Sequence, residues 1–266
     1  MVSPGESAVT GESADERTGT TLRRGIDLLF ALGGEEALTH NGLGVSRAAE
    51  MLSFDKSLVS RTLKTLEDVG VVERDPASRQ YRLSWRLYSL AARSGNQRLL
   101  EAARPILREL VSTLDESAYL SVRDGKQVLT VIAEESARLV QAKEKVGTHT
   151  ALHNTSSGRV LLLDDSPETL RALFPSERLE RSTPFAPATV TDLINRIAEC
   201  REHGYAAVKD ELEIGLFALA VPVRVAGRIV AAINVSSPSY RLSERAELVG
   251  QQVLAAAKKL EHQLGG

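Results

Sequence analysis

The chain has 266 residues, of which 42% are hydrophobic and 26% are charged, a composition typical of a globular protein with one large domain or two ordinary ones. Aromatic residues make up only 4%, so the cores are expected to be mostly aliphatic. The net charge of −2 gives no general signal for nucleic acid, so any basic surface must be local.

The sequence gives no sign of a membrane segment. Its longest apolar runs, 218–223 and 229–235, are too short to span a bilayer, and the N-terminus lacks the pattern of a signal peptide. Cys200 is the single cysteine, which excludes an intrachain disulfide and fits a reducing compartment. We therefore expect a cytoplasmic protein in which Cys200 is a small buried side chain on a helix.

The first residues of the chain, 1–19, are rich in Gly, Ser, Thr and acids, and we expect a disordered acidic tail. Thr20 or Thr21 can cap a first helix, and the glycine pair at 33–34 can end it. A polar connection is expected over 35–44. The apolar positions that predict the buried face of the helix are Leu22, Ile26, Leu29, Phe30 and Leu32.

Residues 45–69 predict two short helices joined by a tight turn at 53–55. The opposite face of the second helix carries short hydroxyls and cations, which suit phosphates and base edges. This pattern is typical of a helix-turn-helix whose second helix reads a major groove. Apolar residues recur at helical spacing at Val45, Ala48, Ala49 and Leu52, and again at Leu58, Val59, Thr62, Leu63, Leu66 and Val69.

Two strands are expected directly behind this unit, at 71–74 and 80–83, with the turn DPASR between them. A β-hairpin in this place is a wing, which can touch a phosphate or a minor groove. Arg61 is the best candidate for a bidentate contact with guanine, while Lys56 and Ser57 lie at a helix N-terminus that attracts phosphate. The expected DNA contacts are Lys56, Ser57, Ser60, Arg61, Lys64 and Arg79.

Beyond the wing, helices are expected over 85–94 and 97–114, followed by alternating strands and helices with a domain boundary near residue 95. The part of the chain after this boundary is expected to be an α+β domain with an antiparallel sheet. Its predicted strands are 119–123, 127–133, 139–142, 216–223 and 228–235. Its predicted helices are 157–163, 167–173, 191–203 with Thr191 as cap, and 243–264.

Four stretches, in this order, resemble the IclR family of bacterial transcriptional regulators: LEDVGVVERDPASRQYRLSWRL, LHNTSSGRVLL, HGYAAVKDELEIGLFALAVPV and AAINVSSPSYRL. The resemblance implies an operator-binding regulator, expected to be a repressor, that works as a dimer or tetramer. It further implies a winged helix-turn-helix domain (20–84) and a GAF-like effector-binding domain (115–266). With the tail (1–19) and the helical linker (85–114), these make four expected segments.

Four positions depart from the usual pattern of that family. Ser53 lies in the turn where glycine is usual, and serine can adopt the turn at some backbone cost. Arg159 stands where the pocket segment usually has lysine. Val208 replaces an acid, and Ala218 stands where a cysteine or small residue is usual, so we expect a pocket more apolar than one built for a very small oxoacid.

The run of small polar residues before the helix at 157 is the candidate effector site. Hydroxyls and unpaired N–H groups at a helix start can bind a carboxylate, and residues 234 and 236 share one face of their strand. We expect a small carboxylate-type effector, aromatic acids included. A helix cap with two surface polar residues is the alternative. The expected effector contacts are Ser156, Ser157, Gly158, Ala218, Asn234 and Ser236.

The main alternative is a small-molecule-processing enzyme or a metal-binding sensor. No nucleophile, P-loop or dinucleotide motif is present in the sequence, so we expect no enzyme, no cofactor and no metal site. His149 and His153 would share a metal on a helix, but their neighbours favour strand or loop, and Cys200 with His203 would have to supply further ligands. The acids Asp210 and Glu211 are expected to be solvated rather than catalytic.

A single recognition helix reads few base pairs, whereas two related by a twofold axis read two half-sites. We therefore expect a homodimer or a dimer of dimers, formed through the helices of 85–114. Some of the apolar residues there must cover the monomer's own core. The candidates are Leu22, Ile26 and Leu29 with Leu87, Leu90, Ala91, Leu99, Ile106 and Leu110.

Overall fold

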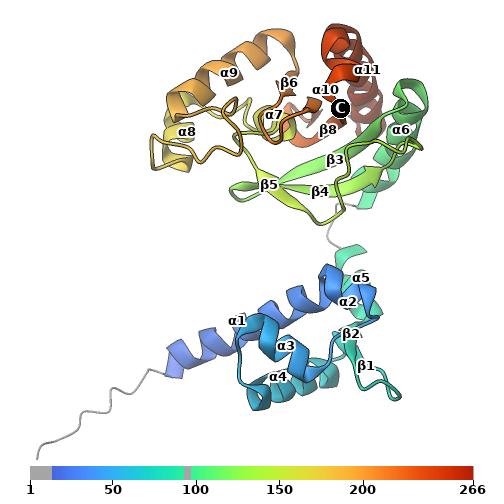
Figure 1. The fold of residues 1–266 in the computed structure, drawn as a ribbon, viewed down its shortest axis with the longest axis vertical. Coiled ribbons are helices and arrows are strands. Elements are labelled where there is room, and N and C mark those ends of the chain that lie inside the picture. The colour runs from blue at the N-terminus through green and yellow to red at the C-terminus, as the bar shows by residue number, and fades with distance from the viewer. Residues whose placement is uncertain (1–13, 93–96, 266) are drawn as a thin grey trace, which may run out of the picture. The chain divides into compact units, whose positions relative to one another are not determined.

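The computed structural model describes residues 14–92 and 97–265. Contacts within the chain divide it into two units, Met1–Gly95 and Asn96–Gly266 (Figure 1). The prediction of a disordered tail falls outside the described residues as far as residue 13, but residues 14–19 are helical, so the tail was predicted too long.

The first unit contains the expected helix-turn-helix and wing. Its helices are α1 (Ala14–Gly33), α2 (Glu35–Thr39), α3 (Val45–Leu52), α4 (Lys56–Asp68) and α5 (Trp85–Ala92). Its strands β1 (Val72–Arg74) and β2 (Tyr81–Leu83) pair antiparallel. The short helix α2 replaces part of the predicted polar connection, and each strand is one residue shorter than predicted.

The core of this unit is small and aliphatic, and α4 supplies its centre with Val59 and Leu63, both fully buried. On α1, Leu28 and Leu32 are buried at a spacing of four residues. The predicted face of α1 was therefore wrong in part, because this helix turns residues 28 and 32 toward α3 and α4. Leu22, Ile26 and Phe30 are exposed instead.

The turn between α3 and α4 is made by Ser53, whose backbone is left-handed at φ 54° and ψ 40°. Its N–H still bonds to the end of α3, and Asp55 then caps α4 by accepting from the N–H groups of Ser57 and Leu58. A left-handed residue with a Cβ costs roughly 1–2 kcal/mol. The predicted serine turn is thus formed in a conformation that favours glycine.

The second unit is built on one six-stranded antiparallel sheet in the order β5-β4-β3-β8-β7-β6. The strands are β3 (Ser117–Asp124), β4 (Gln127–Glu134), β5 (His149–Ala151), β6 (Ala206–Lys209), β7 (Leu216–Val225) and β8 (Arg228–Pro238). This confirms the expected α+β class. The predicted strand at 139–142 was wrong, since those residues form an irregular loop. The edge strand β5 lies where strand or loop was expected, and β6 had not been predicted as a strand.

Helices cover both faces of this sheet (Figure 1). Those on one face are α6 (Gln97–Leu114) and α11 (Ala246–Leu264), and those on the other are α7 (Ser156–Leu161), α8 (Pro167–Leu173) and α9 (Val190–His203). The short α10 (Ser239–Leu242) and a 3₁₀ turn, Ser243–Arg245, precede α11. Thr189, rather than Thr191, caps α9. Among the described helices, none is long and apolar enough to cross a membrane.

Helix α6 belongs to the core of the second unit rather than to a free linker. Its Ile106 and Leu110 are buried against α11 and the sheet, and Leu99 packs on the same cluster. All three were among the candidates for a dimer interface, some of which were expected to cover the monomer's own core instead. Ile106 and Leu110 belong to that core group.

Replacing Ser53 by glycine is expected to stabilise the first unit by about 0.5–1 kcal/mol, because glycine adopts the left-handed turn without a Cβ penalty. Trp85, the single tryptophan, lies in this unit, so its fluorescence during urea unfolding provides the measurement. The matched control is Ser60→Gly inside α4, which should destabilise by about 0.5 kcal/mol. A destabilised Ser53→Gly variant would contradict the turn geometry.

Candidate functional site

The outer face of α4 carries the residues expected to read DNA. All five that were predicted on this helix are exposed: Lys56, Ser57, Ser60, Arg61 and Lys64. Their exposure follows from the amphipathic pattern, since Val59 and Leu63 on the opposite side are fully buried. The side chains of this face are thus available to a partner.

Two of these residues are already engaged within the protein. The N–H and hydroxyl of Ser57 both donate to Asp55 Oδ1, and these bonds lower the pKa of the Asp55 carboxyl. Lys64 Nζ lies 3.2 Å from Glu67 and 3.1 Å from Asp68. Because Asp55 caps α4, a phosphate at the start of this helix would meet the Asp55 carboxylate. That negative charge reduces the attraction for phosphate expected at Lys56 and Ser57. Arg61 forms no ion pair within the described ranges.

The tip of the wing is held by Asp75, which accepts hydrogen bonds from the N–H groups of Ala77 and Ser78. The next residue, Arg79, has φ 59° and is exposed. The guanidinium of Arg74 lies 5.3 Å from the centre of the Tyr81 ring. A locally bonded turn thus presents Arg79 to solvent.

The second unit contains a cavity of about 650 Å³. It lies between the sheet, the start of α7 and two loops, 140–145 and 212–215. Five of the six predicted effector residues line it together: Ser156, Ser157, Ala218, Asn234 and Ser236. The cavity is also lined by Tyr119, Asn154 and Glu144, and by apolar side chains that include Val140, Val208, Leu212, Ile214 and Leu216.

The sixth residue, Gly158, does not line the cavity. A Cβ at this position would come within 2.1 Å of the Leu152 carbonyl oxygen, so glycine is needed for the close approach of α7 to the chain before it. Its N–H donates to Thr155 Oγ1 at 3.1 Å and is not free for a ligand. The expected role of Gly158 as an effector contact is therefore corrected to a packing role.

Three buried polar atoms in the cavity wall lack a hydrogen-bond partner in the described chain: Asn154 Oδ1, Ser156 Oγ and Ser157 Oγ. Nearby, Ser236 Oγ donates to Asn234 Oδ1 at 3.2 Å. Leaving a buried polar group unpaired costs about 1–3 kcal/mol. A ligand that bonds to these groups would recover part of that cost.

The loop 140–145 is fastened across the cavity by side chains from the sheet and from α10. Tyr119 donates its hydroxyl to the Ala142 carbonyl at 2.7 Å, and burial raises the pKa of Tyr119 to about 12, so it stays a donor. Arg241 donates to the Val140 carbonyl at 2.8 Å. Thr130 donates to the carboxyl group of Glu144. These contacts were missed because loop 139–142 was predicted to be a strand.

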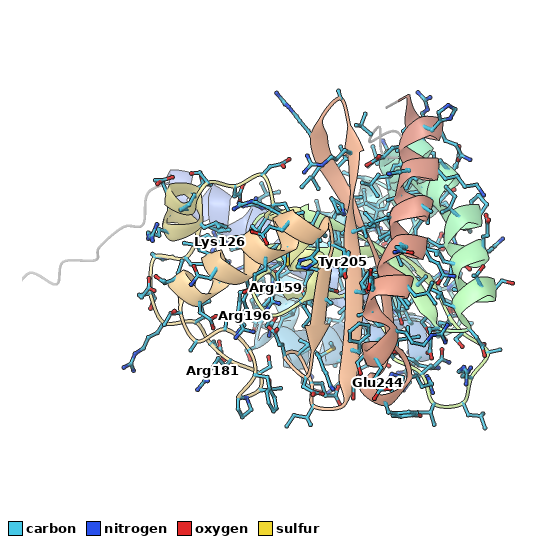
Figure 2. The ribbon with its side chains drawn as sticks, turned by 90° about the horizontal axis from the view of Figure 1, so that it is seen from above. Lys126, Arg159, Arg181, Arg196, Tyr205 and Glu244 are labelled. Carbon is cyan, nitrogen blue, oxygen red and sulfur yellow. The ribbon has the colours of Figure 1, made fainter. Side chains whose placement is uncertain are left out.

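The opposite loop is anchored by Glu211, which is buried at 6% exposure. Its carboxylate bonds to Arg159, which is 3% exposed, and to Arg196 at 2.9 Å, and Arg196 also pairs with Asp192. Figure 2 shows Arg159 and Arg196 beside each other. Burial raises the pKa of Glu211, while the two guanidiniums act in the opposite direction. The prediction that this acid is solvated was wrong.

The residues of the metal alternative are engaged separately. His149 bonds to Asp124 at 2.9 Å, whereas His153 bonds to the Glu180 carbonyl at 2.7 Å. Cys200 is buried on α9 as predicted, and burial raises the pKa of its thiol. In residues 14–92 and 97–265, no three or more His, Cys, Asp or Glu residues are grouped to hold a metal ion.

Comparison with known families decides the assignment. The family described as Bacterial transcriptional regulator IclR C-terminal matches residues 92–262, and the IclR helix-turn-helix domain matches residues 21–76. The chain belongs to the IclR family. It is accordingly a transcriptional regulator with a DNA-binding helix-turn-helix domain.

Relatives in the IclR family match over nearly the whole chain. The regulator BhcR of Paracoccus denitrificans is 31% identical over 90% of this chain and 85% of that protein. The repressor AllR of Escherichia coli K12 is 26% identical over 96% of this chain and 93% of that protein. A crystal structure of an IclR homologue with 4-hydroxybenzoate, from Microbacterium hydrocarbonoxydans, has a TM-score of 0.78, 24% identity and coverage of 92% and 99%, which shows a shared fold.

Glu211→Gln is expected to destabilise the second unit by about 3–5 kcal/mol, because it leaves Arg159 buried without its counter-charge. The measurement is thermal unfolding followed by circular dichroism. The matched control is Glu213→Gln, two residues further along the same loop and exposed, which should change stability by no more than about 0.5 kcal/mol. Equal melting temperatures for both variants would contradict the anchoring role of Glu211.

Proposed function

We propose that this IclR-family regulator acts as a repressor whose operator binding is controlled by a small organic acid in the cavity of the second unit. The single observation that carries the effector proposal is the pair of buried Ser156 and Ser157 hydroxyl groups in the cavity wall, which have no partner in the described chain. Hydroxyl groups can donate hydrogen bonds to a carboxylate, whereas the unpaired Asn154 Oδ1 can only accept one from a donor on the ligand. The proposed effector contacts are Ser156, Ser157, Ala218, Asn234 and Ser236.

The size and lining of the cavity support an acid larger than a two-carbon oxoacid, aromatic acids included. Its volume of about 650 Å³ is within the usual range for small-molecule sites. Val208 and Ala218 contribute apolar surface to the cavity wall. The relative crystallised with 4-hydroxybenzoate supports an aromatic acid as one member of the class.

The proposed DNA contacts are Lys56, Ser57, Ser60, Arg61 and Lys64 on α4, with Arg79 on the wing. We further propose a homodimer, or a dimer of dimers, because two half-sites need two recognition helices. Exposed apolar side chains on α1 and α5 support this proposal. They are Leu22, Ile26 and Phe30 with Trp85, Tyr88 and Leu90. The regulator is proposed to work without catalysis and in the cytoplasm, where bacterial operator DNA lies.

Arg61→Ala is expected to lower affinity for a palindromic promoter fragment by about 1–3 kcal/mol, because it removes an unpaired cation that can bond guanine. Affinity should also fall with rising salt, with a slope set by the number of phosphate contacts. The measurement is fluorescence anisotropy over a salt series.

The comparison variant is Lys64→Ala. Because Glu67 and Asp68 already balance the charge of Lys64, this variant should lose less affinity than Arg61→Ala. Binding that depends on neither salt nor DNA sequence would defeat the operator-binding proposal.

A small acid that occupies the cavity is expected to raise the melting temperature of the full chain by mass action. Ser157→Ala should weaken that binding by about tenfold, as expected for one lost hydrogen bond. The same variant should leave the ligand-free melting temperature unchanged or raised, since the Ser157 hydroxyl has no partner. If no acid in a broad panel stabilises the chain, the effector class is wrong.

A further inference from the structure

Glu144 presents an acceptor to the cavity from the loop between β4 and β5. It lines the cavity, and Oε1 of its carboxyl group accepts a hydrogen bond from Thr130 Oγ1. Thr130 is fully buried on β4, so the carboxyl group is held at a defined place on the sheet. A carboxylate has two oxygens that can accept several hydrogen bonds, so the bond from Thr130 leaves capacity for a donor on a ligand in the cavity that Glu144 lines.

Glu144 is held at β4 by Thr130, whereas Ser156 and Ser157 are carried by α7, which packs mainly against β7 and β8. Thr130 lies on β4, whereas Asn234 lies on β8, two strands further along the sheet. Strand spacing puts these two positions about 10 Å apart. Ser121, paired with Thr130, and Tyr119, paired with Asn234, alternate onto the same face of β3, so both positions face the cavity side of the sheet.

The charges around the cavity favour one orientation of an acidic ligand. A ligand carboxylate next to Glu144 would face a like charge. The cations among the lining residues, Lys143 and Lys145, lie on the exposed loop, and Lys143 is 3.5 Å from Glu135. Burial raises the pKa of Glu144, while the hydrogen bond from Thr130 acts in the opposite direction.

We propose that Glu144 determines effector specificity by accepting a hydrogen bond from a hydroxyl or ammonium group at the end of the ligand opposite its carboxylate. The effector class is thereby narrowed from small acids to hydroxy or amino acids whose two groups lie at opposite ends. This inference rests on the proposed effector function, since it assumes that the carboxylate binds at Ser156 and Ser157.

The test compares matched acids that differ in the donor group. Isothermal titration calorimetry with the full chain would use 4-hydroxybenzoate against benzoate, 4-hydroxyphenylacetate against phenylacetate, and 4-aminobutyrate against butyrate. In any pair that binds, the donor-bearing acid is expected to bind at least about tenfold tighter. Glu144→Leu should abolish this difference. Glu144→Gln, which keeps an acceptor oxygen, should retain it for the hydroxy acids.

Two variants keep the test specific. Thr130→Val removes the hydroxyl that holds Glu144 without changing side-chain size greatly, so it should reduce the preference even if Glu144→Leu fails to fold. Glu202→Gln changes an exposed acid on α9 outside the cavity lining and should leave the preference unchanged.

The outcomes distinguish failure of the proposed effector class from failure of the proposed role of Glu144. If no acid of any pair binds, the proposed effector class fails, and this inference fails with it. If acids bind but the members of each pair bind equally, only the role of Glu144 is overturned. A preference that survives in Glu144→Leu would likewise exclude this residue as its source.

Discussion

The buried carboxylate of Glu211 is the contact on which the geometry of the second unit depends. It joins three segments far apart in sequence, because Arg159 lies on α7, Arg196 on α9 and Glu211 itself on the loop before β7. Removing one partner of a buried ion pair lowers stability much more than replacing the whole pair by apolar residues, since the remaining charge stays buried without a counter-charge. The helix start and one loop wall of the cavity are consequently held together by charge, while the other loop is held by hydrogen bonds from Tyr119 and Arg241.

Much of the fold follows from sequence pattern. Period-3.6 spacing placed α3 and α4 correctly, and alternation with turn residues placed the wing and the central strands. The secondary-structure predictions failed where the periodic pattern of apolar residues is too short to recognise or is absent. The edge strands β5 and β6 have three and four residues, too few for alternation to be recognised, and the amphipathic face of α1 was misjudged because the sequence offers several apolar stripes.

The cavity was predictable only in part. Residues 156, 157, 218, 234 and 236 were brought to one place by simple rules for strands and helix starts. Glu144, Tyr119 and Asn154 were missed because their roles depend on tertiary contacts, such as the bond from Thr130. Glu211 was misread for the same reason, since a charged residue in a loop is normally solvated and only the fold brings two arginines to it.

The close approach at Gly158 limits how such a sensor can change its ligand. With no room for even a methyl group between α7 and the Leu152 carbonyl, this helix cannot move closer to the segment before it. A change of ligand is therefore expected to come from side chains that project from the strands and loops. For the engineering of biosensors, the lining positions 144, 208 and 218 can be varied to change ligand preference. Position 158 must stay glycine to keep α7 in place.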